Sequence, residues 1–100
     1  MLLSWGVVLG MDKKRFPSIK AVEWQKKNLF DADLSNMNLG DADLSEAQLV
    51  CADLSEADLI GADLFATNLM GAKLEHVDLR GANLRCQNLD DLKSRGARID

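Results

Sequence analysis

The sequence is poor in the residues that build metal sites, disulfide frameworks and catalytic pairs. Its two cysteines, Cys51 and Cys86, are far apart and lack the short spacing of a zinc site or a disulfide framework. His76 is the only histidine, so a second imidazole ligand is lacking, and no base–nucleophile pair stands out. These absences predict a non-enzymatic protein without metal or cofactor, whose free thiols suit a reducing compartment such as the cytoplasm.

A long apolar run is also missing. Residues 1–10 are mostly apolar, but a membrane-spanning helix needs about 20 such residues. The segment lacks the basic start and the cleavage site of a signal peptide, and its positive cluster at residues 13–15 follows it. We therefore predict no membrane span, and a leader over residues 1–27 that packs on the remainder of the chain.

Basic residues are absent from residues 28–66, which carry nine acidic ones. The net charge is +4 over residues 1–27, −9 over residues 28–66 and +1 over residues 67–100. An acidic band of this kind is usually a solvated exterior. The basic residues elsewhere are interleaved with acids and lack an aromatic platform, which argues against direct nucleic-acid binding.

What the sequence does contain is a leucine at every fifth position, thirteen times in succession. An α-helix turns about 100° per residue, so residues five apart cannot share one face. A straight strand alternates faces, so an odd period sends successive leucines to opposite sides. The ladder comprises Leu29, Leu34, Leu39, Leu44, Leu49, Leu54, Leu59, Leu64, Leu69, Leu74, Leu79, Leu84 and Leu89.

A small residue two positions before most leucines suggests how the chain resolves this conflict. Ala32 and Leu34 share a face of an extended step, and a three-residue bend leads to the next inward residue, Met37. A corner in every repeat winds the chain into a solenoid whose coils pair as parallel strands about 4.8 Å apart. The Asp or Asn directly before most leucines is suited to hydrogen-bond the backbone at the bend. Glycines at the bend, where a positive φ costs little, are Gly61, Gly71, Gly81 and Gly96.

The size of one coil is indicated by residues that recur at longer intervals. The position after the leucine is apolar at Phe30, Val50 and Met70, which are spaced by twenty residues. Met37 and Val77, the bulkier inward residues, are forty apart. Both intervals favour four repeats per coil and a square cross-section.

The repeats resemble those of a known family. Runs such as ADLSE (residues 52–56), ADLIG and GADLF are similar to the A(D/N)LXX signature of pentapeptide-repeat proteins, and the resemblance covers residues 28–100. It implies an all-β fold, a right-handed quadrilateral parallel β-helix with four repeats per coil and therefore three to four coils here. It does not imply one activity, because a fold alone does not define function.

The two ends of the solenoid carry different signals. Ser18 after a proline predicts the start of a short helix over residues 18–26, which would cover the first coil with Trp24 as the plug. At the far end Ser94 replaces the leucine, Ile99 restores it, and no capping helix is expected. Either another chain covers the last coil, or the sequence is a piece of something longer.

Function has to be sought on the residues around the core. Phe30, Val50 and Met70 would stack into an exposed apolar ridge, unless the leader covers it, with Ile60 and Phe65 on other faces. Together with Ile99 at the last coil, these six residues are the predicted protein interface. The leucines predicted to form the core are Leu34, Leu44, Leu54, Leu64, Leu74 and Leu84.

Three functions remain open from the sequence. The leading hypothesis is a non-enzymatic interaction or scaffold module that binds a protein partner or self-associates through a coil end. The resemblance also suggests an acidic mimic of duplex DNA that inhibits a type II topoisomerase. This chain is short for that role, and its last third is mixed in charge. A bacterial effector is the third possibility, since such effectors can carry these repeats.

Overall fold

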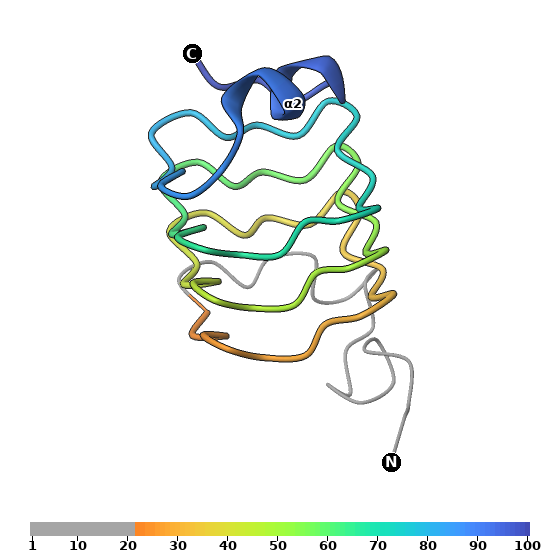
Figure 1. Ribbon diagram of the computed structural model, residues 1–100, viewed down its shortest axis with the longest axis vertical. Helices are drawn as coiled ribbons and strands as arrows, with labels where there is room; N and C mark the ends of the chain where they lie inside the picture. Colours follow the sequence, from red (N-terminus) through yellow and green to blue (C-terminus); the bar gives the residue numbers. More distant parts are fainter. Residues whose placement is uncertain (1–21) are drawn as a thin grey trace.

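The computed structural model describes residues 22–100, which form a four-sided solenoid of stacked coils (Figure 1). Isolated parallel bridges join residues twenty positions apart, from Glu23–Asp43 at one end to Asp78–Arg98 at the other. Four repeats therefore close one coil, which confirms the prediction from the twenty-residue spacing. Within residues 22–100 every bridge is one residue long, because the chain turns a corner before a longer strand can form.

Each corner is a hydrogen-bonded turn that begins at a ladder leucine. At one corner the amide of Ala52 donates to the carbonyl oxygen of Leu49 at 3.0 Å, and Cys51 has a φ of 62°. Such a positive φ at the third turn residue costs a non-glycine residue about 1–2 kcal/mol. The predicted bend glycines all have positive φ, and they share this register with ten non-glycine residues from Lys26 to Cys86.

The Asp or Asn before the leucine supports the corner, as the sequence predicts. The Oδ1 atom of Asp58, for example, accepts a hydrogen bond from the amide of Ile60 at 2.9 Å. Most other residues of this register make the same bond to the amide two positions later. This local bond fixes the entry to each turn, so the corner is encoded within a single repeat.

The interior of the solenoid is filled by the leucine and alanine columns. Of the six predicted core leucines, Leu84 is half-buried and the others are fully buried. Thr67 is the buried polar exception among the described residues, and its hydroxyl donates to the carbonyl oxygen of Leu44 at 2.7 Å. The narrow interior explains why the column that alternates with leucine is mostly alanine.

The predicted N-terminal helix is wrong over the residues that the structure describes. Residues 22–26 already form part of a coil, with the amide of Trp24 donating to the carbonyl oxygen of Asp43 at 2.8 Å. Trp24 stands five positions before Leu29 and is 5% exposed, so among the described residues it is the first member of the buried leucine column rather than a plug on a helix. Ser18 lies outside the described residues.

A helix covers the other end, where none was expected. Helix α2 (Leu89–Ser94) lies across the last coil (Figure 1) and buries Leu92, which is 1% exposed. Asn88 caps its N-terminus by accepting from the amide of Asp91 at 3.1 Å. The amides of Gly96 and Ala97 donate to the carbonyl oxygens of Lys93 and Leu92, which is the Schellman pattern of a helix end.

Two side chains near α2 replace backbone donors that the chain no longer supplies. In the coil below, the carbonyl oxygens of Ala47 and Ala52 accept from backbone amides one level up. At the next level Gln87 Nε2 donates to the carbonyl oxygen of Thr67, and Arg95 Nη2 donates to that of Ala72, both at 2.7 Å. The exposed edge of the last coil is therefore closed by the chain itself, and the expectation of an uncapped end is wrong.

We expect Gly96→Ala to lower the free energy of unfolding by about 2 kcal/mol, roughly twice the effect of Gly81→Ala. Both glycines have positive φ, 98° at Gly96 and 71° at Gly81. A Cβ at Gly96 would lie 3.1 Å from the Cα of Glu75, whereas at Gly81 the nearest atom is 3.9 Å away. Urea denaturation followed by circular dichroism measures both variants, and equal losses would contradict the expectation.

Candidate functional site

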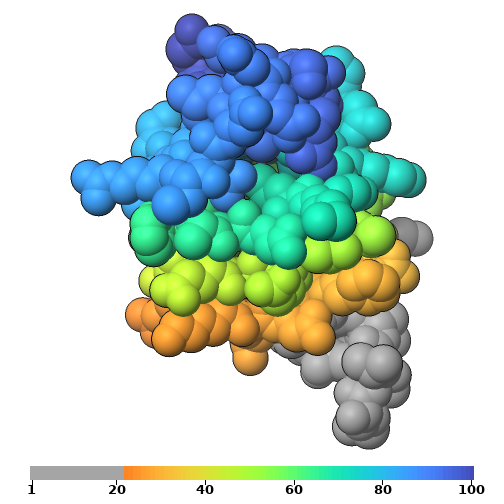
Figure 2. All heavy atoms as spheres, in the orientation of Figure 1, coloured from red at the N-terminus to blue at the C-terminus, as the bar shows by residue number. Residues whose placement is uncertain are grey.

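The main candidate site is a ridge along one corner of the solenoid, formed by Phe30, Val50 and Met70. We call it the apolar ridge. Bridges between Asn28 and Gln48 and between Gln48 and Asn68 put the three residues at the same place in successive coils. Phe30 is 57% exposed and Met70 is 69% exposed, while Val50 between them is half-buried. The ridge thus extends over successive coils, whose stacking appears as layers of colour in Figure 2.

The two sides of the apolar ridge differ in chemistry. The side before the corner presents the amides Asn28, Gln48 and Asn68, of which the last two share a hydrogen bond of 3.2 Å. The side after the corner presents two stacked carboxylates followed by an ammonium group: Asp33, Asp53 and Lys73. Asp31, which directly follows Phe30 and is exposed, adds a third carboxylate at the level of the first coil.

The other predicted interface residues do not join the ridge. Ile60, 39% exposed, and Phe65, 37% exposed, lie on two further corners, so the structure separates them from Phe30, as the sequence predicts. Ile99 is half-buried and packs against the core beside α2. Leu89 is 45% exposed, although its place in the ladder predicts burial, and only the formation of α2 reveals that difference.

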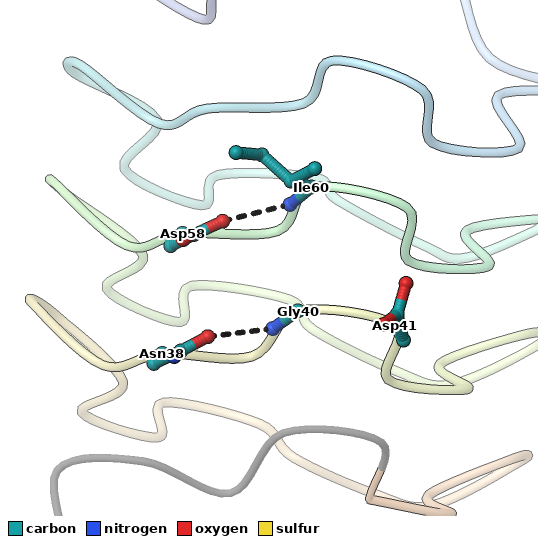
Figure 3. Close-up of a pocket in the computed structure, with 5 residues that line it drawn as sticks. All are labelled: Asn38, Gly40, Asp41, Asp58 and Ile60. Atoms are coloured by element: carbon teal, nitrogen blue, oxygen red, sulfur yellow. Dashed lines mark hydrogen bonds between the residues drawn. The ribbon is translucent and has the colours of Figure 1, made fainter.

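A second surface feature is a hollow of about 190 Å³ on another face. Its lining consists of Asn38, Gly40, Asp41, Asp58 and Ile60 (Figure 3). Gly40, which has no side chain, lies one coil below Ile60 in the same column of the solenoid. The backbone amides of Gly40 and Ile60 are held by Asn38 and Asp58. The polar groups at this place thus stabilise the corners.

Two aspartates of the repeat register have pKa values below the ordinary range. A hydrogen bond from the hydroxyl of Ser55 lowers the pKa of Asp53, with smaller help from the nearby Lys73. The guanidinium of Arg80, 2.6 Å from the Asp78 carboxylate, lowers the pKa of that group. Both shifts arise mainly from a side-chain hydrogen bond to the residue two positions later in the same corner, so they indicate local structure rather than catalysis.

The cysteines, the histidine and the carboxylates of the described residues do not gather into a cluster that would hold a metal ion. Residues 22–100 contain no group of three or more His, Cys, Asp or Glu side chains placed to hold a metal ion. Cys51 and Cys86 are free, exposed and on different corners, and His76 is exposed. No helix within the described part of the chain is long and apolar enough to cross a membrane.

Comparison with protein families agrees with the repeat geometry. The sequence model of pentapeptide repeats matches eight copies over residues 28–64 and 66–92. The chain belongs to the pentapeptide-repeat family. No curated protein matches this member of the family at a significant level. Proteins of this family are generally non-catalytic repeat proteins.

One solved structure of a pentapeptide-repeat protein supports the fold, and two others are similar in sequence. One from the thylakoid lumen of Arabidopsis thaliana is 24% identical with a TM-score of 0.54, and the match covers 71% of this chain. The chain spans 57% of the length of the Arabidopsis protein. A protein from Nostoc PCC 7120 is 28% identical over 97% of this chain and 96% of its own, with a TM-score of 0.36. One from the cyanobacterium Cyanothece 51142 is 28% identical over 83% of this chain and 56% of its own, with a TM-score of 0.40.

Proposed function

We propose that this pentapeptide-repeat protein is a non-enzymatic interaction module whose partner contacts the apolar ridge. The observation that carries the proposal is the register of Phe30, Val50 and Met70, which stacks three apolar side chains with two of them more than half exposed. Exposed apolar surface that is contiguous rather than scattered marks binding sites.

The proposal predicts that replacing the ridge removes a specific partner and leaves the fold intact. The test is cross-linking and affinity capture from source cells with the wild type, the Phe30→Ser/Val50→Ser/Met70→Ser variant, and Phe65→Ser as the matched control. Phe65 is exposed but lies on a different corner. We expect at least one protein to be captured by the wild type and the control, and to be reduced about tenfold with the ridge variant, a loss of about 1.4 kcal/mol. Identical capture by all three would contradict the proposal.

The remaining hypotheses rest on weaker observations. Self-association through Ile99 requires an uncapped end, but α2 and Arg95 cover that end within the chain. A solution mass equal to one chain at high micromolar concentration would dispose of it. DNA mimicry needs a continuous acidic face, whereas here Lys73 follows Asp33 and Asp53 in one column. Location in the cytoplasm stays a prediction, and the Arabidopsis protein comes from the thylakoid lumen.

A further inference from the structure

The dimensions and the charge of the apolar ridge limit which partners fit it. The ridge is one side chain wide, since its flanks are the polar columns of Gln48 and Asp53. A stable contact between two globular surfaces buries about 800 Å² on each side, and one large apolar side chain supplies about 150–250 Å² at most. Three side chains, one of them half-buried, fall short of that area. A narrow, elongated occupant suits the ridge better than a flat surface.

The spacing along the ridge matches the pitch of an α-helix. Stacked coils are separated by about 4.8 Å, while successive turns of an α-helix are about 5.4 Å apart. Over the two intervals from Phe30 to Met70 the mismatch accumulates to only about 1 Å. A helix that lies parallel to the solenoid axis can therefore place one apolar residue against each level, at positions i, i+3 or i+4, and i+7.

The charges beside the ridge specify the flanks of that helix. At the levels of Phe30 and Val50, the carboxylates are Asp31, Asp33 and Asp53, and the acidic stretch from residue 28 to 66 contains no basic residue. At the level of Met70 the same column changes sign at Lys73. A complementary helix thus carries lysine or arginine on one side of its apolar stripe, close to the first two levels. The acidic edge disfavours an anionic membrane surface for the same reason.

We infer that the apolar ridge binds an amphipathic α-helix with a basic flank, aligned with the solenoid axis. The inference rests on the proposed function and names the partner class for the same surface. The helix seats its apolar side chains on Phe30, Val50 and Met70, and its basic side chains face Asp31, Asp33 and Asp53. Cys51 directly follows Val50 and is exposed, so it lies beside the middle of the bound helix.

The experiment uses an 18-residue peptide of leucine and lysine with the leucines on one helical face as the probe. Its binding to the full chain is measured by fluorescence anisotropy, alongside a leucine–glutamate peptide of the same pattern and a leucine–lysine peptide with alternating, strand-forming order. The protein variants are Phe30→Ser/Met70→Ser for the ridge, Asp33→Asn/Asp53→Asn for the charged flank, and Phe65→Ser as the control. A maleimide at the centre of the helical peptide reports the location, because Cys51 and Cys86 lie on different corners.

We expect the leucine–lysine helix to bind the wild type and Phe65→Ser equally and to bind the ridge variant at least tenfold more weakly. The charged-flank variant should lose about three- to tenfold, the leucine–glutamate peptide should bind weakly, and Cys51 should react before Cys86. Equal binding of the ridge variant, preference for the alternating peptide, or dominant labelling of Cys86 would each overturn the inference.

The peptide-binding experiment and the cellular capture experiment can fail independently of each other. If cellular capture depends on the ridge but the helical peptide does not, the partner is not a basic helix and the interaction module stands. If neither depends on the ridge, both proposals fall. A dimer in solution that depends on the apolar ridge would also overturn the inference, because a second copy of this chain, rather than a helix, would then occupy the ridge.

Discussion

Leu54→Ala is expected to lower the free energy of unfolding by about 3–5 kcal/mol, a large share of the roughly 5–15 kcal/mol available to a small domain. Leu54 is fully buried in a middle coil, with core residues both above and below it. The narrow interior leaves the neighbouring coils little freedom to collapse into the space, because their spacing is fixed by backbone hydrogen bonds on both sides. Urea denaturation followed by circular dichroism measures the loss.

Leu89→Ala is the matched control for this prediction. Leu89 occupies the same place in the pentapeptide pattern as Leu54, yet it is 45% exposed at the start of α2. We expect its replacement to change the free energy of unfolding by no more than about 0.5 kcal/mol. Equal losses at the two positions would mean that the ladder continues through Leu89 and that α2 does not form.

Leu92→Ala is expected to have the second-largest effect, a loss of about 2–4 kcal/mol. Leu92 is the buried residue of α2 and is 1% exposed, so its side chain is the apolar cover of the last coil. Its loss also weakens the packing of α2 on the last coil and therefore the placement of Arg95, which donates to the carbonyl oxygens of Leu69 and Ala72. With that edge uncovered, the variant should show a concentration-dependent increase in mass by sedimentation, whereas the wild type should not.

Lys93→Ala is the control that separates the effect of the buried Leu92 side chain from that of α2 itself. Lys93 is exposed on the same helix, and alanine favours helix formation at least as well as lysine. We expect stability within about 0.5 kcal/mol of the wild type and an unchanged mass. An increase in mass with Lys93→Ala as large as that with Leu92→Ala would show that the buried leucine is not what closes the end.

The repeat geometry could be predicted because the residues of a single repeat form the bonds that hold its corner. The Asp58 side chain holds the amide two positions later, and this bond needs no residue from another coil. The twenty-residue register of Phe30, Val50 and Met70 was also accessible, because equivalent outward positions recur once per coil. The sequence therefore already indicates the apolar ridge, and the structure adds how far each of its side chains is exposed.

The ends could not be predicted in the same way. Ser18 after a proline predicts a helix with Trp24 as its plug, yet Trp24 pairs with Asp43 of the next coil and its side chain belongs to the core. Leu89 looked like core because its local pattern is unbroken. In both cases contacts with a neighbouring coil outweigh the local sequence pattern.

The sequence by itself determined the period, the corner in every repeat, the inward leucine column and the four-repeat coil. Only the tertiary structure decided that Leu89 leaves the core, that Leu92 replaces it, and that Gln87 and Arg95 donate to the carbonyl oxygens of Thr67 and Ala72. The physical reason is that a corner is stabilised by bonds within one repeat and its stacked neighbours. The last coil has a neighbouring coil on one side only. Its structure therefore depends on the long-range contacts that bury its remaining apolar surface and pair its remaining backbone polar groups.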